Sequence, residues 1–171
     1  RVPLENVLLG EGRGFEIAQG RLGPGRMHHC MRLIGTAQRS LELACQRATS
    51  RVTFGRPLSK HQSVREDISR MFSEIEMARL LVLKTCHKID QQGVPASIDM
   101  IAATKTTIPL LVQNIIDRAM QMHGAGGLTE DYCMAEGYNY ARWCRQADGP
   151  DQVHQMALGK QIIERYSNSN A

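Results

Sequence analysis

The chain has 171 residues, enough for one compact domain with a buried core, and no shift in composition divides it. Its 21 Lys and Arg residues outnumber its 17 Asp and Glu residues, which gives a formal net charge of +4, without a basic block or interleaved aromatic residues. This pattern argues against nucleic acid as a partner and gives weak support for a small anionic ligand.

The cysteines are odd in number and include no Cys-x-x-Cys pair. They stand at Cys30, Cys45, Cys86, Cys133 and Cys144. Neither a disulfide framework nor a zinc site is predicted, and the pattern is typical of small buried side chains in a reducing compartment. No long uncharged apolar run is present, so we expect no membrane span.

The first ten residues contain a short apolar run from Val7 to Leu9, which predicts a single β-strand. A lone strand is not stable without partners, and no later segment offers one. The sequence also opens at Arg1 without an initiator methionine. We therefore expect that an upstream β-rich part precedes this chain in a longer protein.

Residues 15–50 predict a long helix, because apolar residues recur at intervals of three and four. The predicted stripe is Met31, Ile34, Ala37, Leu41, Ala44 and Ala48. Gly23-Pro24-Gly25 interrupts the pattern and predicts a kink or a restart. His28-His29-Cys30 is not predicted to bind a metal, since three consecutive helical side chains point in three directions.

Four further helices follow, separated by Gly- and Pro-rich breaks. They are expected at about residues 62–90, 97–122, 134–146 and 150–166, with Pro109 inside the second of these. The fold class is therefore all-α. We expect an up-and-down bundle of the four-helix type with short C-terminal helices, preceded by a remnant β-strand.

The break at Ala147-Asp148-Gly149-Pro150 is a predicted helix junction with an acid at the corner. Asp148 either caps the following helix or shares the helix opening with a ligand, and the residues alone favour the cap. A di-metal carboxylate site is not predicted, because the sequence has no Glu-x-x-His and a single Asp151-x-x-His154. No local motif supports a Ser or Cys nucleophile.

Three motifs occur in the order and at about the spacing of a known family. They are Arg51-x-Thr53-Phe54-Gly55 followed by His61-Gln62, then Gln121-x-x-Gly124-x-Gly126, and finally Asp148-Gly149. On these motifs the chain resembles the C-terminal domain of the acyl-CoA dehydrogenase family along essentially its whole length. The resemblance implies that residues 1–10 end a missing β-rich middle domain and that residues 11–171 form the C-terminal helical bundle domain.

The resemblance implies FAD-dependent oxidation of an acyl-CoA thioester to the 2-enoyl-CoA. In this family a carboxylate removes the α-proton while a hydride leaves the β-carbon for the flavin. The usual base is a glutamate in Tyr-Glu-Gly-Thr, and the matching segment here is Ala147-Asp148-Gly149-Pro150. Asp148 is therefore the expected general base, one methylene shorter than the usual residue, and Pro150 replaces the threonine.

The resemblance also assigns ligand-binding residues. Arg26, with Gly25 before it, matches the lining of the acyl-CoA site, and other residues match FAD contacts, of which Arg51, Thr53 and Phe54 reach a neighbouring subunit's cofactor. The FAD residues are Arg51, Thr53, Phe54, His61, Gln62, Gln121, Gly124, Ala125, Gly149, Asp151 and Gln152. Each taken alone also fits a structural role, such as a solvated charge for Arg51 or a helix stop for Gly124.

The Ala-Asp-Gly-Pro segment, with Gly20-Arg-Leu-Gly-Pro-Gly-Arg26, resembles a subgroup of larger acyl-CoA dehydrogenases whose substrates are less typical than straight medium chains. The expected partners are acyl-CoA, further copies in a dimer or tetramer, and electron-transferring flavoprotein or oxygen as acceptor. The family implies the mitochondrial matrix or the peroxisome. The alternative function is a helical oligomerisation module with an inactive site.

Overall fold

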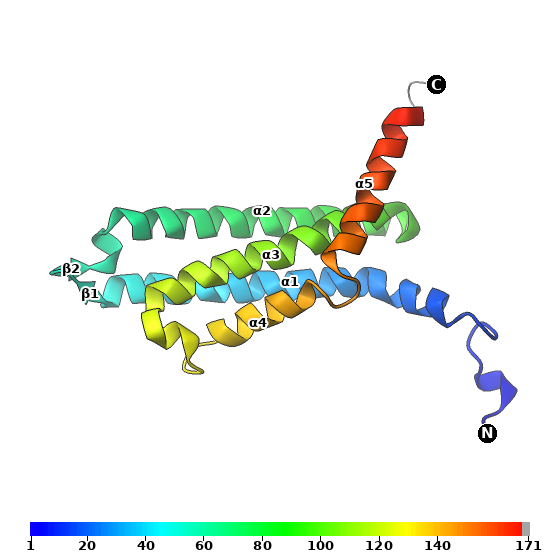
Figure 1. Ribbon diagram of the computed structural model, residues 1–171, viewed down its shortest axis with the longest axis horizontal. Coiled ribbons are helices and arrows are strands. Elements are labelled where there is room, and N and C mark those ends of the chain that lie inside the picture. The colour runs from blue at the N-terminus through cyan, green and yellow to red at the C-terminus, as the bar shows by residue number, and fades with distance from the viewer. Residues whose placement is uncertain (169–171) are drawn as a thin grey trace.

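The computed structural model describes residues 1–168, and within this range the protein is a helical bundle, as expected. Its helices are α1 (Gly14–Ser50), α2 (Gln62–Gln92), α3 (Ile98–His123), α4 (Met134–Cys144) and α5 (Asp151–Asn168). Short 3-10 turns are η1 (Leu4–Asn6), η2 (Leu58–Lys60), η3 (Pro95–Ser97) and η4 (Gly124–Leu128). Figure 1 shows α1, α2 and α3 lying lengthwise, α4 lying along the same body, and α5 leaving it at a steep angle.

The strand expected at residues 7–9 is not formed, and the prediction was wrong in this detail. Leu4–Asn6 is a 3-10 turn, and the residues from Val7 to α1 are irregular. The physical reason is the lack of a partner, because an extended segment needs a neighbouring strand for its backbone hydrogen bonds.

The strands within the described range lie between α1 and α2. β1 (Val52–Thr53) and β2 (Arg56–Pro57) pair antiparallel, with Thr53 opposite Arg56. Phe54 and Gly55 form the tight turn with φ of 52° and 75°, and positive φ at both central residues is what such a hairpin requires. The hairpin projects from one end of the bundle (Figure 1).

The first helix is continuous through Gly23-Pro24-Gly25, so the restart expected there does not occur. Proline removes one helical hydrogen bond, but the helix extends well beyond it on both sides and packs against its neighbours. Gly23 is buried, and a Cβ atom at this position would lie 2.7 Å from Cγ1 of Val94. The glycine therefore permits a close approach between α1 and the turn before α3.

The core lies between α1, α2 and α3, and α3 contacts α1, α2, α4 and α5. Apolar residues spaced by three and four along α2 and α3 are buried, among them Met71, Ile75, Ile108 and Ile115. The stripe of α1 was wrong at Met31, which is 37% exposed. The residues that face inward on this part of the helix are Met27, Cys30, Leu33 and Ile34.

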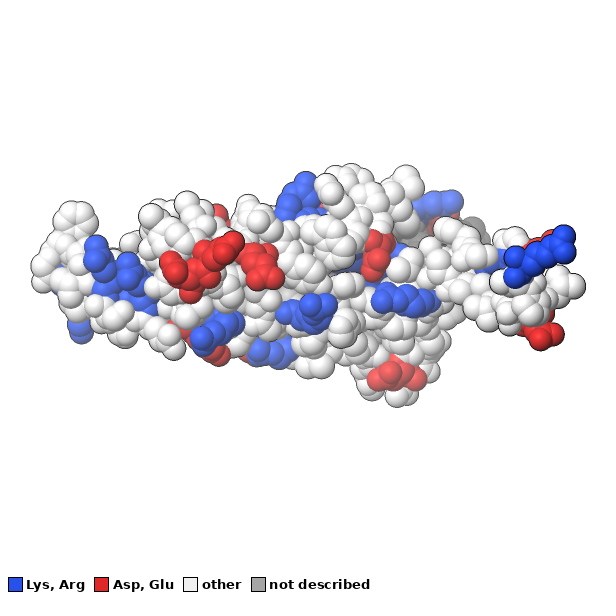
Figure 2. All heavy atoms as spheres, turned by 90° about the horizontal axis from the view of Figure 1, so that it is seen from below, with Lys and Arg blue, Asp and Glu red and all other residues white. Residues whose placement is uncertain are grey.

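The surface carries charges of both signs. Figure 2 shows Lys and Arg side chains interspersed with Asp and Glu side chains on one face, without a continuous basic field. None of the helices within residues 1–168 is long and apolar enough to cross a membrane.

The central position of α3 gives a stability prediction. Ile115 is fully buried, so Ile115→Ala should lower the free energy of unfolding by about 3 kcal/mol, through lost burial and the cavity left behind. Ile163→Ala on α5 removes the same atoms from an exposed site and should change the free energy of unfolding by about 0.5 kcal/mol or less. Urea unfolding of both variants provides the measurement, and equal losses would contradict the packing described.

A second prediction concerns acid stability. Burial alone would raise the pKa of Asp99, but hydrogen bonds from Lys88, Arg165 and the Met100 N–H outweigh it and lower the pKa from 3.8 to about 2. A lowered carboxyl pKa adds stability above the unfolded-state value, and this stability is lost as pH falls from about 4 to 2. Because Arg165 is largely solvated, the expected loss is about 1–2 kcal/mol.

Urea unfolding between pH 5 and about pH 2 tests this contribution. Asp99→Asn should remove part of the decline, whereas Asp117→Asn, an exposed control on the same helix, should keep it. Superimposable curves for the two variants would show that Asp99 does not make this contribution.

Candidate active site

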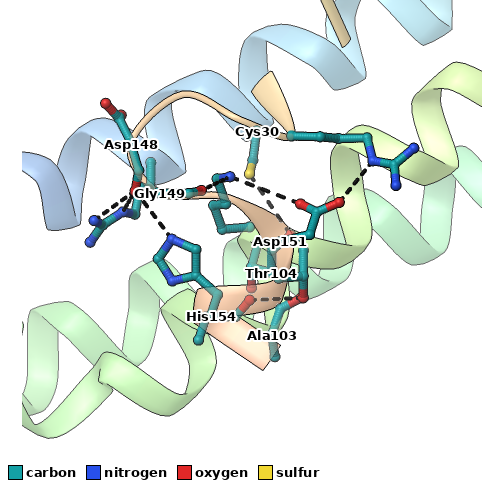
Figure 3. Close-up of polar contacts among 12 residues, drawn as sticks. Cys30, Ala103, Thr104, Asp148, Gly149, Asp151 and His154 are labelled. Atoms are coloured by element: carbon teal, nitrogen blue, oxygen red, sulfur yellow. Dashed lines mark hydrogen bonds and ion pairs between the residues drawn. The ribbon is translucent and has the colours of Figure 1, made fainter. Parts of the chain in front are cut away.

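The corner between α4 and α5 has a left-handed backbone. Asp148 has φ of 57° and Gly149 has φ of 103°, conformations that aspartate tolerates and glycine adopts freely. The Asp148 carbonyl oxygen accepts hydrogen bonds from Arg26 Nε at 3.1 Å and Nη2 at 2.8 Å, and from His154 Nε2 at 3.1 Å. Figure 3 shows these contacts converging on the peptide oxygen while the carboxylate points away from His154.

The next carbonyl is held by a buried lysine. Lys105 is 4% exposed, and its Nζ donates to the Gly149 oxygen at 2.6 Å and lies 4.0 Å from Asp151 Oδ1. Asp151 is also buried, and its Oδ2 accepts from Arg145 Nε at 2.8 Å. The side chain of Asp151, expected to contact a cofactor, is therefore turned into the bundle, where it balances two cations of the corner.

Burial shifts the pKa values of the basic residues at this corner. Burial lowers the pKa of Lys105, and the nearby Asp151 carboxylate acts in the opposite direction. Burial likewise lowers the pKa of Arg26 and of His154. Because Nε2 of His154 faces a carbonyl oxygen, the neutral ring must carry its proton on this nitrogen.

The Asp148 side chain does not cap α5. Its Oδ2 atom is buried and accepts no hydrogen bond from the residues that the structure describes. The nearest basic group is Nε2 of His29 on α1, at 3.8 Å. A buried carboxylate oxygen without a donor is costly, so this atom is a candidate for chemistry more than for structural support.

Asp148 lies at the edge of a large groove of about 840 Å³. The groove runs between the first part of α1, the turn before α3 and the beginning of α5. Its apolar lining includes Phe15, Leu22, Val94, Ile98 and Val153, and its polar lining includes Arg26, Asp148 and His154. A long apolar cleft with a few polar groups at one place suits a ligand with a flexible apolar chain and one reactive polar end.

The structure brings Arg26, Asp148 and Gly149 together. Gly25 precedes Arg26 on α1 and is half-buried, while Gln152 is exposed in the first turn of α5. The predicted substrate and catalytic residues therefore form one local site, with Arg26 bonded directly to the residue that carries the carboxylate.

The other predicted cofactor residues lie at the end of the bundle that carries the hairpin (Figure 1). They are Arg51, Thr53, Phe54, His61, Gln62, Gln121, Gly124 and Ala125. All but Thr53 and His61 are exposed, and Phe54 is 98% exposed. The Nε2 atom of His61 is buried without a hydrogen-bond partner among the described residues, and a Cβ at Gly124 would meet no atom within 4 Å.

The two groups are far apart within one chain. Arg26 and Ser50 stand on the same continuous helix, and 24 residues at the α-helical rise separate them by about 36 Å. The predicted residues therefore form two half-sites, one at the corner and one at the hairpin end.

Several residues of the site were not predicted from the sequence. Lys105 gave a signal, because it is a lysine on the apolar stripe between Ile101 and Ile108. His29 and His154 stood out only as possible metal ligands, an interpretation that the sequence did not support, and nothing pointed to their contacts with Asp148. Among residues 1–168, no group of three or more His, Cys, Asp or Glu side chains is arranged to hold a metal ion.

The lysine contact gives a third prediction. Lys105→Met leaves the Gly149 carbonyl without its donor and removes a buried positive charge near Asp151, and it should lower the free energy of unfolding by about 2–4 kcal/mol. Lys84→Met changes an exposed lysine of α2 and serves as the control. A similar midpoint for both variants in urea would show that Lys105 does not hold the corner.

Comparisons with known proteins agree with this architecture. Residues 12–163 match the sequence family described as acyl-CoA dehydrogenase, C-terminal domain. The chain is 52% identical over 167 residues to acyl-CoA dehydrogenase family member 10 of Mus musculus, covering 98% of this chain and 16% of that protein. It is 50% identical over 160 residues to family member 11 of Gallus gallus, covering 94% of this chain and 21% of that protein.

The solved structure of butyryl-CoA dehydrogenase from Megasphaera elsdenii superposes with a TM-score of 0.85 at 33% identity, over 95% of this chain and 42% of that one. The chain thus spans less than half of that enzyme and only about a sixth to a fifth of the two relatives' length. The family match extends over nearly the whole chain and places the Asp148 corner within it. The chain belongs to the acyl-CoA dehydrogenase family, of which it is a C-terminal domain.

Proposed function

We propose that the protein carrying this domain is an FAD-dependent acyl-CoA dehydrogenase in which Asp148 is the general base. The observation that supports the proposal most directly is the buried, unpartnered carboxylate oxygen of Asp148 at the edge of an apolar groove. A base must reach the proton that it removes, and a carboxylate already engaged by strong donors would be a poor acceptor. The donors of this site contact the peptide oxygens of the corner instead.

The groove fits the acyl part of the substrate. An acyl-CoA has a long apolar chain on a thioester, and its α-carbon lies at the junction between the two. With the chain along Leu22, Ile98 and Val153, the thioester end would meet the polar residues Arg26 and Asp148. The apolar walls would exclude water from the reacting carbon and strengthen the electrostatic contacts around it.

The residues present also fit FAD at two places. At the corner, Gln152 offers a polar side chain in the exposed first turn of α5. At the hairpin end, Arg51 suits a pyrophosphate, and Nε2 of His61 and the open surface at Gly124 provide further contacts. When bound, FAD supplies the acceptor for the hydride that leaves the β-carbon.

The separation of the half-sites supports an oligomer. Because one rigid helix holds them about 36 Å apart, the hairpin end of one chain would complete a flavin site formed at the corner of another. A dimer or a tetramer satisfies this requirement. The acceptor, electron-transferring flavoprotein or oxygen, and the compartment, mitochondrial matrix or peroxisome, are proposed from the family alone.

Asp148 would perform the proposed proton abstraction with its side-chain carboxylate. The carboxylate takes the α-proton of the thioester, and the C–H electron pair remains on the substrate. Arg26 and His154 fix the Asp148 carbonyl, which leaves side-chain rotation as the main freedom of the residue. This positioning holds the base near the groove without neutralising it.

The proposal is tested on the parent protein that contains this domain. It should purify as a yellow flavoprotein, and acyl-CoA should bleach the flavin absorbance under anaerobic conditions. A parent protein that is colourless, or one whose flavin responds to no acyl-CoA of any chain length, would favour the helical oligomerisation module with an inactive site.

Asp148→Asn gives the fourth prediction. The variant keeps the shape of the residue and the corner hydrogen bonds but lacks a basic oxygen, so flavin content should stay unchanged while bleaching slows at least about 10²-fold. Asp90→Asn, an exposed residue in the last turn of α2 that does not line the groove, is the matched control. Stopped-flow absorbance measures both, and wild-type bleaching by the Asp148 variant would remove this residue from the role of base.

A further inference from the structure

A histidine stands directly behind the proposed base. His29 of α1 lies with Nε2 3.8 Å from Oδ2 of Asp148, the oxygen that accepts no hydrogen bond. Its other nitrogen, Nδ1, lies 2.8 Å from the hydroxyl of Tyr140 on α4. The three side chains form a line from the carboxylate through the imidazole to the phenol.

Aromatic packing fixes this line. The Trp143 ring packs edge to face on His29 with centroids 5.9 Å apart, and it stacks on Tyr140 at 5.6 Å. The Arg32 guanidinium lies over the Tyr140 ring at 5.3 Å. The imidazole therefore has little freedom to turn away from either neighbour.

The line ends at a second groove, separate from the apolar one. Tyr140 lines this surface groove of about 490 Å³ together with Arg32, Arg39 and Glu136. At the other end, His29 and Asp148 both line a small cavity of about 10 Å³. A shift of about 1 Å brings the 3.8 Å separation into hydrogen-bond range.

The proposed reaction needs such a route. Once Asp148 has taken the α-proton, an acyl chain in the groove blocks the direct path from the carboxylate to water. The base must lose this proton before the next turnover. His29 faces the only Asp148 carboxylate oxygen that is buried without a hydrogen-bond partner among the described residues.

We propose that His29 and Tyr140 form a proton-exit relay for Asp148, an inference that rests on the proposed function of Asp148 as the base. The carboxylic acid O–H bond breaks and its proton bonds to His29 Nε2. In the same step Nδ1–H gives its proton to the Tyr140 oxygen, and the phenol gives its original proton to water. Asp148 returns to the carboxylate, and no group is oxidised or reduced. Once the groove empties, Nε2–H returns its proton to Asp148, which releases it to water in the groove, while Tyr140 gives a proton to Nδ1 and takes one from water, so that the starting Nδ1–H tautomer is restored.

The charged surroundings suit a ring that is neutral between transfers. Burial lowers the pKa of His29, Asp148 acts in the opposite direction, and Arg32, His28 and Arg21 of the same helix lower it further. From α4, Tyr140 faces the ring, and burial raises the pKa of this phenol, so that it stays protonated. His29 is therefore available to accept a proton near neutral pH.

The relay is tested in the full-length FAD-loaded parent enzyme by exchange of the α-proton. The probe is an acyl-CoA with sulfur in place of the β-carbon, which has an acidic α-hydrogen but no β-hydride to lose. In D₂O the wild-type enzyme should exchange the α-hydrogen for deuterium, followed by mass spectrometry. Without the relay, Asp148 returns the same proton to the same carbon, so exchange should slow while abstraction itself continues.

His29→Gln should slow exchange by about tenfold or more, which is part of the effect typical of a positioned acid or base. Its rate of flavin bleaching by acyl-CoA should stay within about threefold of the wild-type rate. Tyr140→Phe removes only the hydroxyl and keeps the ring packing, and it should slow exchange as well. His87→Gln, an exposed histidine of α2, should behave as wild type. Exchange in both His29→Gln and Tyr140→Phe within about twofold of His87→Gln would overturn the relay.

The pH dependence of exchange is a second measurement, and a purely structural role of His29 would not affect it. Wild-type exchange should fall as His29 becomes protonated, at a pH below the ordinary value of 6.5 because its pKa is lowered, and this decline should be absent in His29→Gln. A decline that persists unchanged in His29→Gln would also overturn the relay. Asp148→Asn separates the two proposals. Exchange and bleaching at wild-type rates in Asp148→Asn would refute Asp148 as the base. Loss of both in Asp148→Asn, together with normal exchange in His29→Gln, would refute only the relay.

Discussion

The site depends on two backbone carbonyls that are held by basic side chains of three helices. The oxygens of Asp148 and Gly149 accept hydrogen bonds from Arg26 of α1, Lys105 of α3 and His154 of α5. The bonds from Arg26 and Lys105 are charge-assisted and therefore stronger than neutral ones, and they tie α1 and α3 to a single turn. The left-handed backbone at the two residues is maintained because its carbonyls point at these donors.

The same arrangement explains why the carboxylate is available for chemistry. Three basic side chains surround a short segment with two acids, yet the strong donors contact Asp151 or the peptide oxygens. A carboxylate of Asp148 paired directly with Arg26 would gain stability and lose basicity. By binding the backbone of Asp148, Arg26 fixes the position of the residue without a hydrogen bond to its side chain.

Much of the fold could be predicted because helical periodicity and Gly or Pro breaks are local properties. The five helices and their ends follow from such signals, whereas Met31 was misplaced because neighbouring positions such as Cys30 fit the same stripe. Gly23-Pro24-Gly25 predicted a kink or a restart, and the restart does not occur because tertiary packing keeps α1 continuous beside Val94. The strand predicted at residues 7–9 is not formed because a strand needs hydrogen bonds from a second strand, which the pattern of a single segment does not supply.

The family resemblance singled out Asp148 and Arg26, whose roles stay predictions, but not their geometry. In the structure Arg26 donates directly to the backbone oxygen of Asp148. The inward turn of Asp151 depends on Lys105 and Arg145, which are distant in sequence or carry no motif. Contacts such as that between His29 and Asp148 join residues more than a hundred positions apart, which periodicity within one helix does not encode.

The substitution of aspartate for the glutamate typical of the family bears on this contact. A glutamate would carry its carboxylate about 1.5 Å farther from the same backbone. The shorter aspartate leaves its Oδ2 atom 3.8 Å from Nε2 of His29 on α1, so the residue type bears on the proposed relay as well as on the proposed reach toward substrate.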